Sequence, residues 1–172
     1  MKKTNFGNIT AAIVATLVLT VGSAFGGTAT SNLTVSATVS GSCAIGTDGL
    51  AFGVYDPFFV NATTPLAGTG DVHVLCTEGL AAVITLDQGL NPAPGSSAFT
   101  PLRQMSSGGS MLGYEIFREP SRTITWGNTS ETGETYIGAG VPGILTAFGQ
   151  VPSGQNVPSG VYTDTVVATI TF

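Results

Sequence analysis

The sequence predicts an all-β protein of the sandwich or barrel type. Beyond the first 26 residues, no stretch shows the apolar spacing of 3.6 residues that a long amphipathic helix requires. The chain instead has short runs rich in Val, Ile, Thr, Tyr and Phe, which is typical of strands. Its 24 glycines and 9 prolines occur at the breaks between these runs, and 42% hydrophobic residues are enough to fill a core. We therefore expect many short strands joined by turns.

Nine runs are candidate strands, and clusters of Gly, Pro, Asn and Ser between them predict turns. The candidate strands are residues 31–40, 49–54, 70–76, 81–87, 111–117, 122–126, 134–138, 143–149 and 161–172. The candidate turns lie at Asp56-Pro57, Asn91 to Gly95, Ser107-Gly108-Gly109 and Pro152-Ser153-Gly154.

Residues 1–26 have the pattern of a secretory signal peptide. Lys2 and Lys3 form a positive start, an apolar run extends from Ile9 to Val21, and small residues around Ala24 to Gly26 offer a cleavage site. A membrane anchor is the alternative, but the apolar run is shorter than the roughly 20 residues that a span needs. We expect a secreted mature chain that begins within a few residues of Gly27.

Charge excludes one class of partner. Both lysines lie in the signal peptide, so the mature part has three arginines against ten acidic residues, a net charge of −7. Such a chain cannot grip a phosphate backbone, and nucleic-acid binding is disfavoured. Only 9% of all residues are charged, against about 25% in ordinary soluble domains. A surface so poor in charge suits a protein that packs against other copies of itself.

Two cysteines and one histidine are the candidates for special chemistry. In an oxidising compartment the pair Cys43 and Cys76 is expected to form a disulfide. A catalytic thiol is the alternative, but no partner residue supports it. His73 lies between two valines in a strand-like run, which indicates an ordinary strand side chain. We expect neither a metal nor a cofactor.

Two segments near the ends of the mature chain alternate most regularly between apolar and polar residues. Side chains along a strand point to alternate faces, so each segment offers an apolar edge. In the first segment the apolar residues are Leu33, Val35, Ala37 and Val39. In the second they are Val166, Ala168, Ile170 and Phe172. The pattern does not decide whether both are ordinary strands of one sandwich or whether the first belongs to a neighbour's core.

A series of short motifs resembles the spore coat protein U domain family, whose members include subunits of archaic (Csu-type) chaperone–usher pili. The motifs cover nearly the whole mature chain in the expected order. They are Gly41-Ser42-Cys43, Ala51 to Pro57, Pro65-Leu66, Gly70 with Val72 to Thr77, Arg103-Gln104-Met105, Leu112 to Phe117, Thr125-Trp126-Gly127 and Gly160 to Val166.

The resemblance implies an incomplete immunoglobulin-like β-sandwich that is completed by donor-strand complementation. Residues 27–41 would be the N-terminal extension and residues 42–172 the pilin domain. Leu33, Val35, Ala37 and Val39 would be the donor side chains, and Val166, Ala168, Ile170 and Phe172 would line the acceptor groove. The implied partners are other pilus subunits, a periplasmic chaperone and an outer-membrane usher. Strand addition of this kind combines backbone hydrogen bonds with side-chain pockets.

The predicted function is therefore that of a structural subunit of an extracellular pilus, exported through the periplasm to the cell surface, where it supports adhesion and biofilm formation. Two alternatives stay open. A small outer-membrane β-barrel would explain the alternating end that finishes in Phe172, although one Trp and four Tyr are few for two aromatic girdles. A monomeric carbohydrate-binding domain could stack a sugar on Trp126 or Tyr136. An enzyme is not expected, because no catalytic cluster is evident and a Glu115/Glu119 pair is the nearest to one.

Overall fold

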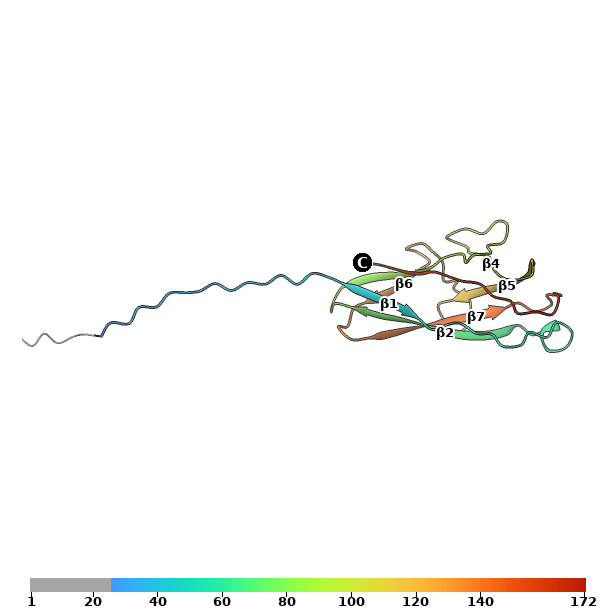
Figure 1. Ribbon diagram of the computed structural model, residues 1–172, viewed down its shortest axis with the longest axis horizontal. Coiled ribbons are helices and arrows are strands. Elements are labelled where there is room, and N and C mark those ends of the chain that lie inside the picture. Colours follow the sequence, from blue (N-terminus) through green and yellow to red (C-terminus); the bar gives the residue numbers. More distant parts are fainter. Residues whose placement is uncertain (1–25) are drawn as a thin grey trace, which may run out of the picture. The chain divides into compact units, whose positions relative to one another are not determined.

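The computed structural model describes residues 26–172 (Figure 1). The predicted signal peptide lies almost wholly outside the described residues. Chain contacts divide the molecule into an N-terminal unit that ends at Ala37 and a domain that extends from Thr38 to Phe172. Residues 26–42 form no strand, and their side chains are exposed.

The domain is built from strands and one short 3₁₀ turn. The strands are β1 (Cys43–Thr47), β2 (Leu66–Cys76), β3 (Ala81–Leu86), β4 (Arg103–Ser107), β5 (Ser110–Phe117), β6 (Glu134–Ile137), β7 (Gly143–Val151) and β8 (Ala168–Thr171), and the 3₁₀ turn η1 is Val60–Ala62. They form two antiparallel sheets, one with the order β1-β2-β7-β5-β4 and one with the order β6-β3-β8. β1 and β8 are therefore edge strands, one in each sheet.

The core lies between the two sheets and follows from strand periodicity. On β2, Val72, Val74 and Cys76 are buried, while the residues between them are more exposed. β3 supplies Ile84 and Leu86 from the other sheet. Because alternate side chains point to one face of a strand, each sheet contributes one apolar face and the two faces pack together. The predicted all-β sandwich is confirmed.

Trp126 and Arg103 are large buried side chains, and all of their polar atoms except Nη1 of Arg103 are paired. Trp126 is fully buried and donates from Nε1 to the carbonyl oxygen of Ile84 at 2.8 Å. It therefore cannot stack on a sugar, which removes one of the two stacking residues that the carbohydrate-binding alternative named. Arg103 is 1% exposed, and it donates to the carbonyl oxygens of Leu86 and Trp126 at 2.9 and 2.8 Å. Burial lowers the pKa of Arg103. These bonds join the two sheets at the level of β4.

Two local predictions are confirmed. The disulfide joins Cys43 and Cys76, which are also paired in the register of β1 with β2. The turn at Gly108 and Gly109 connects β4 to β5, and both glycines have positive φ, 55° and 88°. A two-residue hairpin of this twist requires positive φ at both central positions, which glycine adopts without strain.

Several strand boundaries predicted from the sequence are wrong. Residues 31–40 form no strand, because they have no partner for their backbone groups within the described part of the chain. The 49–54 segment makes only a bridge from Ala51 to Thr69. The 122–126 segment begins with Arg122 at φ 55°, a turn conformation, and makes only the bridge from Thr125 to Phe117. Of residues 161–172, only 168–171 form a regular strand.

Two strands were not predicted. β4 has the polar sequence Arg-Gln-Met-Ser-Ser, and β1 is a short run that includes Gly46. Neither run shows clean alternation of apolar and polar residues. Each becomes a strand through its partner: β4 through the tight hairpin with β5, and β1 through its pairing and disulfide with β2.

Candidate functional site: an open groove between two strand edges

The four predicted donor side chains make no core contacts. Leu33, Val35 and Val39 are 88%, 84% and 82% exposed, and Ala37 is also exposed. Three large aliphatic side chains in one alternating segment thus face solvent. Single exposed apolar residues are ordinary, but a row of them in one segment is a feature of interaction surfaces.

The predicted acceptor side chains fall into two groups. Val166, Ala168 and Ile170 are half-buried and pack against the core, while Phe172 is 58% exposed. Val166 and Ala168 line a cavity, which Ile170 and Phe172 do not. The accessible part of the predicted acceptor edge is therefore its first half.

The backbone of the 161–167 segment is anchored on one side only. Thr163 exchanges two backbone hydrogen bonds with Ser106 of β4, at 2.8 and 3.1 Å. Val167 donates to the Asp87 carboxylate at 2.9 Å, and its carbonyl accepts from the Asp87 N–H at 3.1 Å. Among the described residues, no strand pairs with the opposite edge of this segment.

A second edge faces the first across a groove. It belongs to β1 and to residues 48–52, whose other side follows β2. This segment lies very close to β2, since a Cβ on Gly70 would come within 2.9 Å of the Leu50 Cα atom. Glycine at this position is what allows the close approach.

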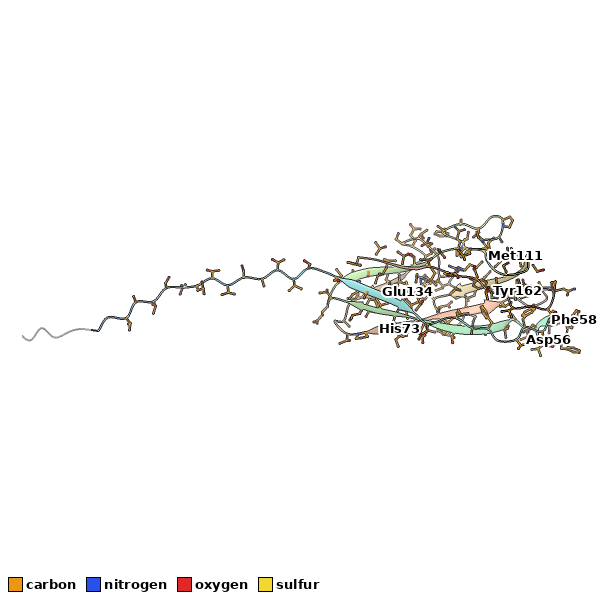
Figure 2. The ribbon with its side chains drawn as sticks, in the orientation of Figure 1. Asp56, Phe58, His73, Met111, Glu134 and Tyr162 are labelled. Atoms are coloured by element: carbon orange, nitrogen blue, oxygen red, sulfur yellow. A yellow bond between two sulfur atoms is a disulfide. The ribbon has the colours of Figure 1, made fainter. Side chains whose placement is uncertain are left out.

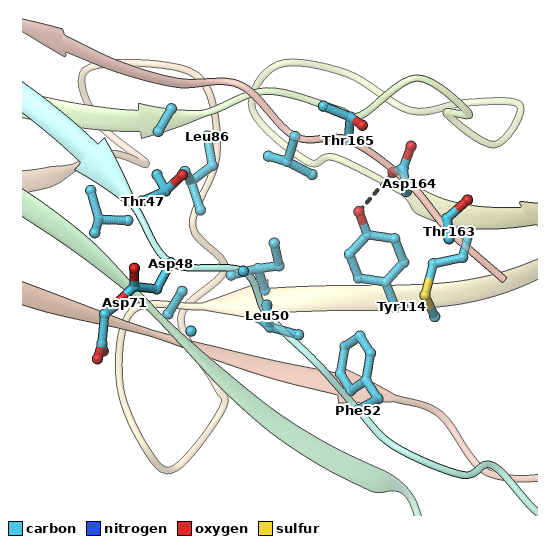
Figure 3. Close-up of a pocket in the computed structure, with 18 of the residues that line it drawn as sticks. Thr47, Asp48, Leu50, Phe52, Asp71, Leu86, Tyr114, Thr163, Asp164 and Thr165 are labelled. Carbon is cyan, nitrogen blue, oxygen red and sulfur yellow. Dashed lines mark hydrogen bonds between the residues drawn. The ribbon is translucent and has the colours of Figure 1, made fainter. Parts of the chain in front are cut away.

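Two adjoining cavities lie between the two edges. The first, of about 360 Å³, lies among Leu50, Leu86, Ile116, Val166 and Ala168 (Figure 3). The second, of about 730 Å³, extends toward Val54, Phe58, Val157 and Val161. Leu50, Phe52, Met105 and Tyr162 line both, so the two cavities form one groove along the seam between the sheets. Its lining is mostly apolar but includes Asp48, Asp71 and Asp164.

A polar chain of contacts crosses the floor of this groove. The Tyr114 hydroxyl donates to Asp164 at 2.7 Å, and the Tyr114 ring meets Phe52 edge-on at 5.9 Å between centroids (Figure 3). Asp164 also accepts from the backbone N–H of Leu90 and the side chain of Asn91, at 2.9 and 3.2 Å. Burial raises the pKa of Tyr114, and its bond to Asp164 raises it further, so the phenol stays a donor. Through Tyr114, these contacts connect the 161–167 segment with Phe52 on the other side of the groove.

Tyr162 makes a hydrogen bond that is typical of immunoglobulin-like sandwiches. Its hydroxyl donates to the carbonyl oxygen of Pro158, four residues upstream, at 2.9 Å. A tyrosine at the start of a strand that bonds back to the preceding corner marks strand F of immunoglobulin-like sandwiches. In the complete fold, strand G would lie on the free side of strand F.

Comparisons with known proteins agree with this geometry. A sequence profile described as the Spore Coat Protein U domain matches residues 29–169. The chain belongs to the spore coat protein U domain family. Protein U from Myxococcus xanthus is 51% identical over 153 residues, which cover 84% of this chain and 86% of that protein. The resemblance seen in the sequence motifs is thereby confirmed.

A solved structure is similar to this spore coat protein U domain in fold. It is the CsuC–CsuE chaperone–tip adhesion subunit pre-assembly complex from the archaic chaperone–usher Csu pili of Acinetobacter baumannii. The TM-score is 0.55 at 22% sequence identity, and the match covers 78% of this chain and 40% of the matched chain. This chain therefore spans two fifths of the length of that relative, and the likeness concerns the sandwich.

Sequence reasoning missed most residues that line the groove of this spore coat protein U domain. Leu50, Phe52, Tyr114 and Tyr162 are separated by up to 112 positions, and only the sandwich brings them together. A signal was nevertheless present, because Phe52, Tyr114, Tyr162 and Asp164 lie inside motifs that carried the family resemblance.

Other candidates for special chemistry are structural. The His73 imidazole lies 2.9 Å from the Asp48 carboxylate on an exposed strand face. Within residues 26–172, no group of three or more His, Cys, Asp or Glu side chains is placed to hold a metal ion. No helix in the same range is long and apolar enough to cross a membrane.

Proposed function

We propose that this protein is a structural, non-catalytic subunit of an extracellular fibre in which each copy completes the sandwich of the next by donating its N-terminal segment. The observation that carries the proposal is that one chain contains both an open groove and an exposed apolar segment. The domain has a mostly apolar groove between two free strand edges, and the segment before it has a row of exposed apolar side chains.

The physical fit between the two supports strand addition. A strand inserted in the groove would pair with the free edge of residues 161–167 and satisfy its backbone groups. Alternate side chains Leu33, Val35, Ala37 and Val39 would enter the cavities. Burial of each larger one stabilises the contact by roughly 1.5–3 kcal/mol. A head-to-tail contact that does not close on itself yields a filament.

The same groove would need protection before assembly. An exposed apolar slot with unpaired edges promotes uncontrolled association. We therefore propose a periplasmic chaperone that fills the groove first and an outer-membrane usher where the incoming subunit replaces it. The similarity in fold to a subunit from a chaperone–subunit complex supports this part. We further propose that the fibre lies at the cell surface, where it supports adhesion and biofilm formation.

Deletion of residues 27–39 from the mature chain tests the proposal. We expect the full mature chain to form multimers that resist SDS without heating and thin fibres in electron micrographs. The shortened chain should keep the thermal unfolding midpoint of the domain but form neither. Fibres from the shortened chain would show that residues 27–39 are not the donor.

A further inference from the structure

One loop of the domain is held by a network of hydrogen bonds. It extends from Tyr55 to Thr64 between β1 and β2. The Asp56 carboxylate accepts the backbone N–H groups of Phe58 and Phe59 at 3.0 and 3.1 Å. Asn61, only 2% exposed, accepts from the Asp56 N–H at 2.8 Å and donates to the Thr64 carbonyl at 2.9 Å. Such bonds fix the turn without help from apolar packing.

The base of this loop is fastened to a second loop. The Tyr55 hydroxyl donates to the Pro152 carbonyl at 3.0 Å and accepts from the Gln155 N–H at 2.9 Å. The Gly154 N–H donates to the Asn61 carbonyl at 2.8 Å. The buried polar groups of the loop thus hold a defined shape.

The apolar side chains of the loop point outward. Phe58, Phe59 and Val60 are 73%, 80% and 65% exposed, and Figure 2 shows Phe58 beside Asp56 at one end of the domain. Three consecutive exposed apolar residues on an ordered loop form a patch that polar bonds hold in place. Patches of this kind mark interaction sites.

The loop borders the open end of the groove. Phe58 lines the wider cavity together with Val54 and Val161. At the other end, Cα atoms of β1 and β8 approach within 8 Å. An inserted strand needs two spacings of 4.7–4.9 Å, roughly 9.5 Å in all. The domain that follows a donor strand must therefore lie at the open end, beside this loop.

The incoming domain cannot stay far from the mouth of the groove. Only Ser40, Gly41 and Ser42 separate Val39 from Cys43, and these four Cα steps span at most about 14 Å. The end of the domain from which its extension leaves is also where β6 ends, since Ala81 pairs with Ile137. Just there, Ile137 and Val141 are 64% and 59% exposed.

We propose that Phe59 and Val60 form a second interface between consecutive copies of this chain, by packing on the Ile137–Val141 turn of the copy that donates its strand. The occupant is a second copy because the short linker brings that domain, and no other, to the loop. The interface rests on the proposed function, since it needs donor-strand insertion to bring the two domains together. It adds a domain–domain contact to the strand contact and sets the angle between successive copies.

The test compares a whole incoming chain with its donor segment alone. The acceptor is the mature chain carrying Val35→Asp, immobilised at low density, so that it accepts a strand without donating one. It is offered either the labelled mature chain or a labelled peptide of residues 27–42. The loop variant adds Phe59→Ser and Val60→Ser, since neither residue lines a cavity. The control adds Phe99→Ser, which is 53% exposed and also lines neither cavity.

We expect the loop variant to bind the whole chain on the order of tenfold more weakly and to bind the peptide as before, because the loss of buried contact corresponds to about 1.4 kcal/mol or more. Phe99→Ser should change neither. Incoming chains with Ile137→Ser and Val141→Ser should show the same defect on an unaltered loop. If the loop variant fails to fold, the incoming chain with Ile137→Ser and Val141→Ser still tests the second interface.

The outcomes separate the two proposals. If the acceptor takes up neither peptide nor chain, donor-strand insertion itself is wrong and the interface falls with it. If both bind and the loop variant weakens neither, or weakens both equally, the second interface is overturned while the proposed function stands.

Discussion

The two alternating segments of this chain have similar sequences and opposite environments. Leu33 to Val39 keeps its apolar row more than four fifths exposed at each large side chain, whereas Val166 to Ile170 rests half-buried on the core. The two segments, Leu33 to Val39 and Val166 to Phe172, contain a similar proportion of apolar residues and the same number of threonines. The difference is that the second segment has neighbours: β3 and β4 pair with one of its edges, and the core covers one face. Alternation therefore encodes a face to be covered, and the rest of the fold decides what covers it.

The strongest test of the difference between the two segments is to place one charge in each of them. Val35→Asp should abolish assembly, because the carboxylate would enter an apolar pocket with no evident partner. It should leave the unfolding midpoint of the unassembled domain unchanged, since Val35 is exposed there. Val166→Asp is the matched change, and it should destabilise the domain by about 2–3 kcal/mol because Val166 packs on the core. Unheated SDS gels and thermal unfolding measure the two effects. Equal effects of both changes would contradict the assigned roles.

The disulfide lies where the first segment meets the domain, and its removal should affect only the domain. The double change Cys43→Ser and Cys76→Ser opens a loop with a sequence separation of 33 and should lower the free energy of unfolding by about 2–4 kcal/mol. Urea denaturation of oxidised and variant protein gives the value. The peptide of residues 27–42 should still bind well below the denaturation midpoint, and a loss of binding there would show that β1 needs the bond to keep its edge.

A smaller change tests how the acceptor wall is held. Tyr114→Phe removes the donor to Asp164 but keeps the ring against Phe52. The unfolding free energy should fall by about 1–2 kcal/mol, since Asp164 loses one of its donors. Binding of the peptide should weaken as the 161–167 edge loses its anchor. Full retention of both stability and binding would show that the backbone bonds from Ser106 and Asp87 hold the wall alone.

The smallest expected effect lies away from both segments and serves as a reference. In the loop after β5, weak desolvation of the Glu119 carboxylate is outweighed by hydrogen bonds from Thr123 and Ile124, and its pKa falls to about 2 from an ordinary value near 4.5. Because the folded pKa is the lower one, this contribution to stability is present above about pH 4.5 and is lost as the pH falls toward 2. Over this pH range, the thermal unfolding midpoint of the wild-type protein should therefore fall by more than that of Glu119→Gln. Parallel pH curves would contradict the assignment, and assembly at neutral pH should be the same for both.

Most of the sandwich was predictable where a single strand carries its own pattern. β2, β3, β5 and β7 coincide with predicted strands because each buries one face, and burial imposes alternation on the sequence itself. β1 and β4 were not predictable, since a short edge strand exists through its partner's hydrogen bonds and needs no apolar row of its own. The groove was predictable only in part. The motifs that contain Phe52 and Asp164 were visible in the sequence as a family resemblance, but the sequence did not show that these residues lie close together.

The sequence by itself determined that this chain is all-β, that Cys43 and Cys76 form a bridge, and that two segments each have an apolar face. These are local properties, set by side-chain order along one strand or by residue type. The tertiary structure alone decided that the face of Val166 and Ala168 borders a groove between two free edges, and that Phe59 and Val60 project beside its open end. The physical reason is that a groove arises from the packing of segments that are far apart in the sequence, and no single segment records what lies beside it.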